Sequence, residues 1–283
     1  MEFDPRLTPA RPDLAAATLK GRVDAPRFVD GERMIVFDGV ADLRREPVPD
    51  AMLDTQALHG ETVMTYDDNG EGWSYVQLER DGYVGYMPSA ALTRDIAVPT
   101  HRVAVSRSFS FGGPSIKLPP LAILSLNSRV TIVDRKDQFA VTHRGHFIFA
   151  DHLVPLPQTE TDFVSVAERL IGIPYFWGGK TSLGLDCSGL VQIALEACGV
   201  LSPRDTDMQE KALGRALTIP DDLSGLQRGD LVFWKGHVGI MRDATELLHA
   251  SGHQMLVVSE ALQVARDRII AKGSGPITSI KRL

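Results

Sequence analysis

One cysteine and two histidines are the side chains of this sequence whose types and spacing could do chemistry. Cys187 stands in the run Asp186–Leu190, where a loop leads into apolar residues at helical spacing, and we predict a helix from Ser188 to about Cys198. The start of a helix exposes N–H groups and partial positive charge, which stabilise a thiolate. The thiolate attacks carbonyl carbon, and the same N–H groups can hold the oxyanion that forms. A cysteine on an amphipathic helix is more often a small core residue, so the histidines must decide between these interpretations.

His237 and His249 lie in consecutive predicted strands, residues 237–241 and 247–250, joined by a turn around Asp243. A hairpin symmetric about Asp243 places the histidines directly opposite each other, with Cβ atoms about 4.5–5.5 Å apart. That distance suits a base and the group that orients it, which is what a cysteine nucleophile needs. One cysteine and two histidines could also bind zinc, but the close pairs typical of metal sites, such as Cys-x-x-Cys, are missing. We therefore expect no metal and no cofactor.

Two segments that differ in composition and strand pattern precede the elements that must position these side chains. Residues 1–29 form an N-terminal extension that is rich in Pro, Ala and Arg and has little strand pattern. Short β-branched or aromatic runs, separated by turn residues such as Asp81 and Gly82, then continue to Leu156. The pattern occurs twice, so we predict two small β-barrels, residues 30–97 and 98–157. The expected strands are 34–37, 61–66, 73–78, 85–87, 129–133, 139–141 and 147–149.

Beyond the second barrel the apolar residues take helical spacing. A first helix over residues 163–171 begins at Thr161 or Asp162. A third helix begins near Asp207, where Thr206 and Gln209 are spaced as a capping box. Strands follow at 230–234, 237–241 and 247–250. Helices first and strands later predict an α+β domain.

The composition limits the kinds of partner. A net charge of −6 and a pI near 5.8 argue against a general nucleic-acid binder. Residues 1–5 lack the basic start and apolar run of a secretory signal, and no apolar run approaches the roughly 20 residues of a membrane span. Two cysteines are too few for a secreted disulfide framework. We therefore expect a cytoplasmic protein that binds neither nucleic acid nor a membrane; its partner proteins are unknown.

Four short blocks of the sequence resemble the NlpC-type papain-like cysteine peptidases of bacterial cell walls. The blocks occur in family order with family-like spacing and are Asp186–Leu190, Gly229–Phe233, Gly236–Ile240 and His249–Ser251. The resemblance covers about Thr161 to Leu283, and the two upstream barrels resemble bacterial SH3-like domains. It implies a papain-like α+β catalytic domain over residues 158–283, preceded by the two barrels.

The resemblance implies roles for the three reactive residues: Cys187 as nucleophile, His237 as base, and His249 as the residue that orients His237. The architecture is similar to the cytoplasmic γ-D-glutamyl-L-diamino acid endopeptidases that recycle murein peptides. This implies cleavage after γ-D-glutamate in short peptides that begin with free L-alanine. The missing export signal fits that branch of the family.

The resemblance also suggests substrate-binding residues. Asp205 matches an acidic position that holds the amino group of the substrate, although it could instead cap a helix. Tyr175 matches a tyrosine near the thiol, or packs in the core. Ser188 follows the nucleophile, where it binds substrate or caps its helix. Tyr83, or Tyr86 in its place, resembles a barrel tyrosine that closes the end of the site occupied by the N-terminus of the substrate.

Other interpretations stay open at this point. The chain could hydrolyse polymeric peptidoglycan, bind wall peptides without catalysis, or transfer an acyl group to an acceptor other than water. Cys198 lies about 16 Å from Cys187 along the predicted helix at ~1.5 Å per residue, too far for a disulfide. We therefore predict that Cys198 is a core residue.

Overall fold

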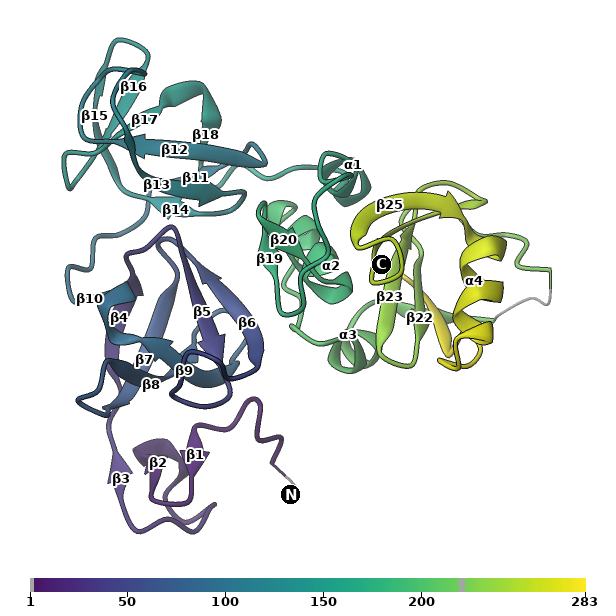
Figure 1. Ribbon diagram of the computed structural model, residues 1–283, viewed down its shortest axis with the longest axis horizontal. Helices are drawn as coiled ribbons and strands as arrows, with labels where there is room; N and C mark the ends of the chain where they lie inside the picture. The colour runs from purple at the N-terminus through teal and green to yellow at the C-terminus, as the bar shows by residue number, and fades with distance from the viewer. Residues whose placement is uncertain (1–2, 219–221) are drawn as a thin grey trace. The chain divides into compact units, whose positions relative to one another are not determined.

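The computed structural model describes residues 3–218 and 222–283, which fall into two compact units, residues 1–158 and 159–283. The first unit is built of strands and short turns, and the second combines helices with a sheet (Figure 1). The predicted α+β class is therefore confirmed. Within the described residues, no helix combines the length and the apolar character that crossing a membrane requires.

The N-terminal extension contains strands that the sequence did not indicate. They are β1 (Ala10–Arg11), β2 (Leu14–Ala16) and β3 (Phe28–Val29), with a 3₁₀ helix at Ala17–Leu19. Strands of two or three residues are too short to show an alternating pattern, so composition alone gave the wrong expectation. Leu14 is fully buried and packs with Tyr75 and Val84 of the following barrel.

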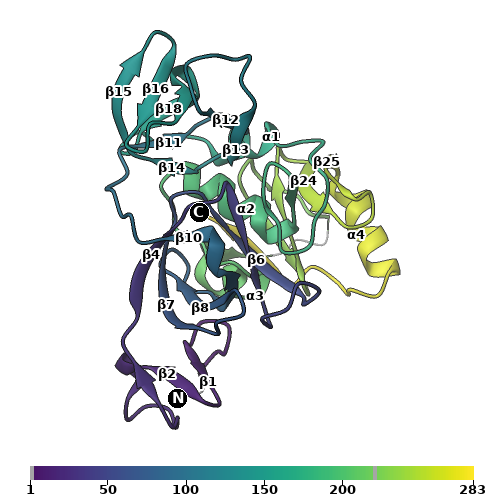
Figure 2. The same cartoon turned by 60° about the vertical axis from the view of Figure 1, so that its left-hand side comes forward.

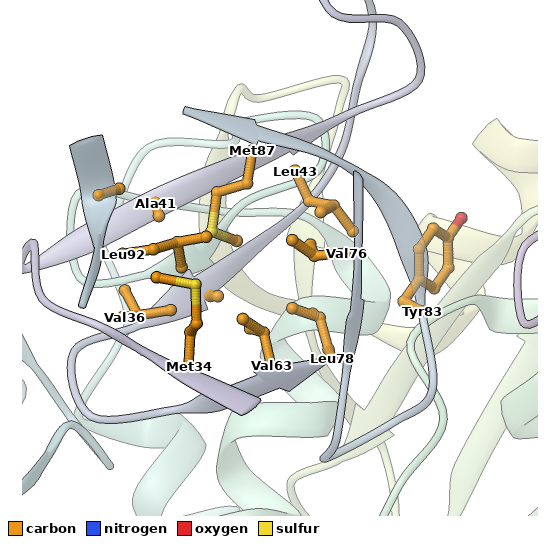
Figure 3. Packing of buried hydrophobic residues seen from close by; sticks show 12 residues of the cluster. Met34, Val36, Ala41, Leu43, Val63, Val76, Leu78, Tyr83, Met87 and Leu92 are labelled. Carbon is orange, nitrogen blue, oxygen red and sulfur yellow. The ribbon is translucent and has the colours of Figure 1, made fainter. Parts of the chain in front are cut away.

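The first barrel is one sheet with strand order β10-β4-β7-β8-β9-β5-β6. Its elements are β4 (Glu32–Val36), β5 (Val40–Arg44), β6 (Leu53–Leu58), β7 (Thr62–Asp68), β8 (Trp73–Leu78), β9 (Val84–Pro88), a 3₁₀ helix (Ser89–Ala91) and β10 (Leu92–Thr93). Alternate side chains of these strands, among them Val36, Val63 and Val76, fill a buried core (Figure 3). Strands β5 and β6 were not expected, because polar residues such as Gln56 interrupt their apolar pattern.

The second barrel contains two sheets, of order β14-β11-β18 and β13-β12-β17-β16-β15. Its elements are β11 (His101–Val103), β12 (Arg107–Phe111), β13 (Pro120–Ser125), β14 (Arg129–Val130), β15 (Ile132–Lys136), β16 (Phe139–Thr142), β17 (Phe147–Phe149), a 3₁₀ helix (Ala150–His152) and β18 (Leu153–Pro155). The single strand predicted at 129–133 is wrong. The chain changes sheets at Thr131, where the Thr100 hydroxyl accepts the Ile132 N–H in place of a neighbouring strand.

The second unit, as described by residues 159–218 and 222–283, has a sheet of order β21-β26-β22-β23-β24-β25. The sheet lies between helix α2 and helix α4 (Figures 1 and 2). The elements are α1 (Phe163–Glu168), β19 (Lys180–Thr181), β20 (Gly184–Leu185), α2 (Cys187–Ala197), α3 (Thr206–Ala212), β21 (Arg215–Leu217), β22 (Leu231–Trp234), β23 (His237–Met241), β24 (Glu246–Ser251), β25 (Leu256–Ala261), α4 (Leu262–Ala271) and β26 (Ser279–Arg282).

The starts of the helices differ in detail from the prediction. Asp162, one of the two residues expected to begin the first helix, caps α1 by accepting the Val164 N–H at 2.9 Å. The capping box predicted at α3 is wrong, because Thr206 is already the first helical residue. The amide of Gln209 instead donates to the carbonyl oxygens of Ser188 and Pro203, both at 2.9 Å. Gln209 therefore ties α3 to the start of α2.

Candidate active site

Cys187 is the first residue of α2, and its sulfur is buried, with 7% of the residue exposed. The thiol donates to the carbonyl oxygen of Gly236 at 4.0 Å and lies 3.8 Å from the hydroxyl oxygen of Thr206. The N–H of Val238 donates to the sulfur. Burial, together with the negative charge of Asp186, raises the pKa of the Cys187 thiol to about 11. The thiol is therefore protonated at neutral pH, despite its place at a helix start, and needs a base.

His237 begins β23, between the two residues whose backbones contact the sulfur. Its Nε2 lies 2.7 Å from Nδ1 of His249 on β24. The two histidines are not directly opposite, so the predicted register is wrong. Ile240 pairs with Leu248, and continuing this register places Gly239 opposite His249. The hairpin is centred one residue later than Asp243, because the Arg242 N–H donates to the carbonyl oxygen of Glu246 at 2.7 Å.

Gly239 makes room for this diagonal contact. A Cβ atom at Gly239 would lie 2.7 Å from Cδ1 of Leu247 and 3.2 Å from Cβ of His249. Diagonal neighbours on one face of a sheet are about 7–8 Å apart at Cα, within reach of aromatic rings. His237 therefore reaches His249 across a position that carries no side chain.

The electrostatics favour an uncharged base. Burial lowers the pKa of His237 to about 3, and the electrostatic effects of His249 and Arg268 lower this pKa further, while Glu260 acts in the opposite direction. A neutral imidazole beside a protonated thiol is the arrangement of a general base and its nucleophile. The structure thus places the backbone on both sides of His237 against the Cys187 sulfur and the His237 ring against His249. The catalytic roles of the three residues stay predictions.

Two further residues, which the sequence did not indicate, lie on the other side of His249. Glu260, near the end of β25, places Oε1 2.8 Å from Nε2 of His249. Arg268 of α4 donates to both oxygens of Glu260. Neither β25 nor α4 was predicted. The apolar run Leu256–Val258 is the weak signal that could have indicated a strand here.

A buried ion pair, which the sequence did not indicate either, fixes the start of α2. The carboxylate of Asp186 caps the helix by accepting the Gly189 N–H at 2.7 Å, and it also accepts the Gly178 N–H at 2.9 Å. Arg204, which is 1% exposed, donates to both of its oxygens at 2.9 and 2.6 Å. The pair connects Cys187 to the segment that carries Asp205.

The structure places three predicted substrate-binding residues in the catalytic unit. Ser188 is buried, donates to Asp186 and accepts from Arg204; Asp186, not Ser188, caps the helix. Asp205 occupies the N-cap position of α3, but its side chain makes no capping hydrogen bond. Tyr175 is half-buried, and burial together with the negative charge of the Cys187 thiolate raises the pKa of its hydroxyl. Tyr175 therefore lies in the electrostatic field of the thiol.

Tyr83 and Tyr86 belong to the first barrel. Tyr83 is 3% exposed and stands at the side of the barrel core, with its hydroxyl pointing away from the cluster (Figure 3). Tyr86 is half-buried, with its ring centroid 5.2 Å from that of Tyr75. A contact of either tyrosine with substrate stays a prediction.

Cys198 was predicted to be a core residue, but it is only partly buried. It is half-buried at the C-cap of α2, because the helix ends at Ala197 and the chain turns at Gly199, with φ of +76°. Neither Cys187 nor Cys198 forms a disulfide. Among residues 3–218 and 222–283, no three or more His, Cys, Asp or Glu side chains are grouped so that they could hold a metal ion.

Two segments of the chain match known families. Residues 172–271 match the NlpC/P60 family, and residues 43–92 match the bacterial dipeptidyl-peptidase SH3 domain. The chain is 30% identical to the γ-D-glutamyl-L-lysine dipeptidyl-peptidase of Bacillus subtilis over 71% of this chain and 73% of the relative. It is 28% identical to dipeptidyl-peptidase 6 of Lysinibacillus sphaericus over 77% and 87%.

The fold also has a solved counterpart. An NlpC/P60 family protein from Bacillus cereus superposes with a TM-score of 0.73 at 20% identity, covering 89% of this chain and 99% of the other. At this identity the likeness concerns the fold, over 89% of the chain.

Proposed function

Because the chain belongs to the NlpC/P60 family and is a cysteine peptidase, we propose that it hydrolyses the γ-D-glutamyl–L-diamino acid bond of short murein peptides that begin with free L-alanine. The observation that carries this proposal is the contact of Cys187 with the backbone on both sides of His237, on a chain whose relatives include a γ-D-glutamyl-L-lysine dipeptidyl-peptidase. The reaction releases the dipeptide L-Ala-γ-D-Glu.

The proposed reaction proceeds in two halves. Nδ1 of His237 takes the thiol proton as the sulfur of Cys187 attacks the γ-carbonyl carbon, and N–H groups at the start of α2 stabilise the oxyanion. The C–N bond then breaks, and the imidazolium gives its proton to the departing α-amine of the diamino acid. In the second half, His237 takes a proton from the water that attacks the thioester carbon. The C–S bond then breaks, the dipeptide acid leaves, and the imidazolium returns its proton to the sulfur of Cys187. His249 orients the His237 ring throughout.

Free peptides are the proposed substrates because Asp205 can pair with the α-ammonium group of L-alanine. The position of Asp205 supports this, because the preceding residue, Arg204, donates hydrogen bonds to Asp186, whose carboxylate caps the helix of Cys187. A role in recycling such peptides in the cytoplasm is part of the same proposal. Tyr175, Ser188 and Tyr83 are proposed to line the site.

The test compares three substrates. Purified protein is incubated with L-Ala-γ-D-Glu-L-Lys, with the N-acetylated tripeptide, and with intact peptidoglycan. We expect rapid release of L-Ala-γ-D-Glu from the first alone. Cleavage of intact peptidoglycan at a comparable rate would instead establish a hydrolase of the polymer, and binding of the tripeptide without cleavage would establish a non-catalytic module.

A further inference from the structure

Two residues that the proposed reaction does not yet use, Glu260 and Arg268, lie on the far side of His249. We propose that Glu260, held by Arg268, is a positioning residue that fixes the tautomers of both histidines and so makes Nδ1 of His237 the proton acceptor for Cys187. The inference rests on the catalytic roles proposed above and adds two residues to them.

The topology brings Glu260 to the histidines. Glu260 on β25 pairs directly with Leu247 on β24, so its side chain shares a face of the sheet with His249, two residues further along. Helix α4 follows β25 without a loop and carries Arg268. The His249 side chain is 1% exposed and that of Glu260 is 14% exposed, so water has little access to their contact.

The contacts keep the Glu260 carboxylate ionised. Arg268 donates to its Oε2 at 2.6 Å and also to Oε1, and the Gln254 amide donates to Oε1 at 3.3 Å. Partial burial raises the pKa of Glu260, but the hydrogen bonds from Arg268 and His249 outweigh burial and hold this pKa well below its usual range.

The tautomers follow from hydrogen-bonding capacity. An ionised carboxylate only accepts hydrogen bonds, so Nε2 of His249, 2.8 Å from Glu260, must carry a proton. A neutral imidazole has one N–H, so Nδ1 of His249 is an acceptor. Nε2 of His237, 2.7 Å away, must then be the donor. This leaves Nδ1 of His237 with the lone pair that can take the proton of Cys187.

The charges around the pair determine how variants should change its protonation. The charged and titratable groups acting on His237 and Cys187 come from several elements: Tyr175 before β19, Asp186 before α2, Arg204 before α3, His249 on β24, Glu260 on β25 and Arg268 on α4. Burial has the largest effect on the pKa of His237, but Glu260 raises this pKa and Arg268 lowers it. Loss of the Glu260 charge should therefore lower the pKa of His237, and loss of the Arg268 charge should raise it.

The first experiment reads the tautomers without any substrate. Full-length protein labelled with ¹⁵N-histidine is studied by NMR at neutral pH, and the ring signals are assigned with His237→Gln and His249→Gln. We expect His237 and His249 to be neutral and protonated at Nε2, and the Nδ1–H form to appear in Glu260→Ala. A wild-type His249 protonated at Nδ1 would overturn the proposal.

The second experiment measures kcat/KM against pH for the free tripeptide. The limb governed by His237 should move to lower pH in Glu260→Gln and to higher pH in Arg268→Gln, and should stay in place in Arg268→Lys. Glu260→Ala should lose roughly 10- to 100-fold, as when carboxylates that orient metal-binding histidines are removed. Arg266→Gln is the matched control, because Arg266 is on the same helix but donates to Asp267.

The two experiments separate the possible failures. Thermal unfolding of each variant shows that it is folded before its kinetics are compared. Lower activity with an unchanged pH profile in both Glu260→Gln and Arg268→Gln would show a purely structural ion pair and overturn the inference. No cleavage of the tripeptide by the wild type would contradict the proposed function, while the NMR result would still decide the tautomers.

Discussion

Burial moves the pKa values of Cys187 and His237 in opposite directions, and both movements favour the neutral pair. Burial raises the pKa of the Cys187 thiol to about 11 and lowers the pKa of the His237 imidazole to about 3. The position of Cys187 at a helix start would by itself predict a stabilised thiolate. The carboxylate of Asp186 instead occupies the helix cap and adds negative charge beside the sulfur. At the scale of single residues, proton transfer must therefore accompany the attack on substrate.

The first prediction concerns this pair. Cys187→Ala and His237→Ala should each lower kcat by several orders of magnitude, and the double variant should lose little more, because the two groups act as a unit. The measurement is kcat for the free tripeptide. Cys198→Ala is the matched control and should keep wild-type activity. An inactive Cys198→Ala together with an active Cys187→Ala would contradict the assignment.

The second prediction concerns acid stability. The folded-state pKa of His237, about 3, is below its ordinary value of 6.5. Between these values the unfolded chain binds a proton that the folded protein does not, so the unfolding free energy should fall as pH decreases through this window. His237→Gln removes the contribution and should flatten the curve. Urea denaturation at several pH values measures it, and identical slopes in the two proteins would contradict the prediction.

At the scale of elements, the sequence predicted those whose own residues form a clear pattern. Strands β23 and β24 are short, nearly continuous apolar runs around the histidines, and α2 shows regular apolar spacing, so all three were found. Elements whose own residues show only a weak pattern were missed. Strands β1 to β3 are too short for a pattern, and polar residues end the apolar run of β25 after Val258. Because Glu260 and Arg268 belong to the missed elements, the sequence could supply the three reactive residues but not their support.

The third prediction concerns the buried ion pair of Arg204 with Asp186, which fixes the start of α2. Arg204→Met should lower the unfolding free energy by about 3–5 kcal/mol, because it leaves the buried Asp186 carboxylate without its cation. Activity should fall as well, since Asp186 holds the start of α2. Chemical denaturation measures the first effect. Arg169→Met is the control: its pair with Glu160 is more exposed, with 42% and 34% of the side chains accessible, and should contribute roughly 0–1 kcal/mol.

At the scale of the whole molecule, the chain combines a unit of two barrels with a catalytic unit. The repeated strand pattern was enough to predict both barrels from sequence. The predicted limits, 30–97 and 98–157, stay predictions, and strands β4–β10 and β11–β18 fall within them. Substrate selection is the property of the whole molecule that the proposed function makes testable.

The fourth prediction concerns that selection. Wild-type kcat/KM for the free tripeptide should exceed that for the N-acetylated one by at least roughly 30-fold, equivalent to about 2 kcal/mol, because acetylation removes the charge that pairs with Asp205. Asp205→Asn should raise KM for the free peptide and reduce this ratio. Asp207→Asn, on the neighbouring α3, is the matched control and should leave the ratio unchanged. Equal wild-type rates on the two peptides would contradict the proposed recognition.

The buried, protonated thiol also has a consequence for the chemical durability of the protein. Peroxides and simple alkylating agents react with exposed thiolates, whereas Cys187 has a pKa near 11 and 7% exposure. The enzyme should therefore survive oxidative conditions that inactivate peptidases with a resting thiolate. The same protonated thiol limits inhibitors. An electrophile should react quickly only when it is part of a substrate-like peptide, which places it for attack while His237 takes the thiol proton.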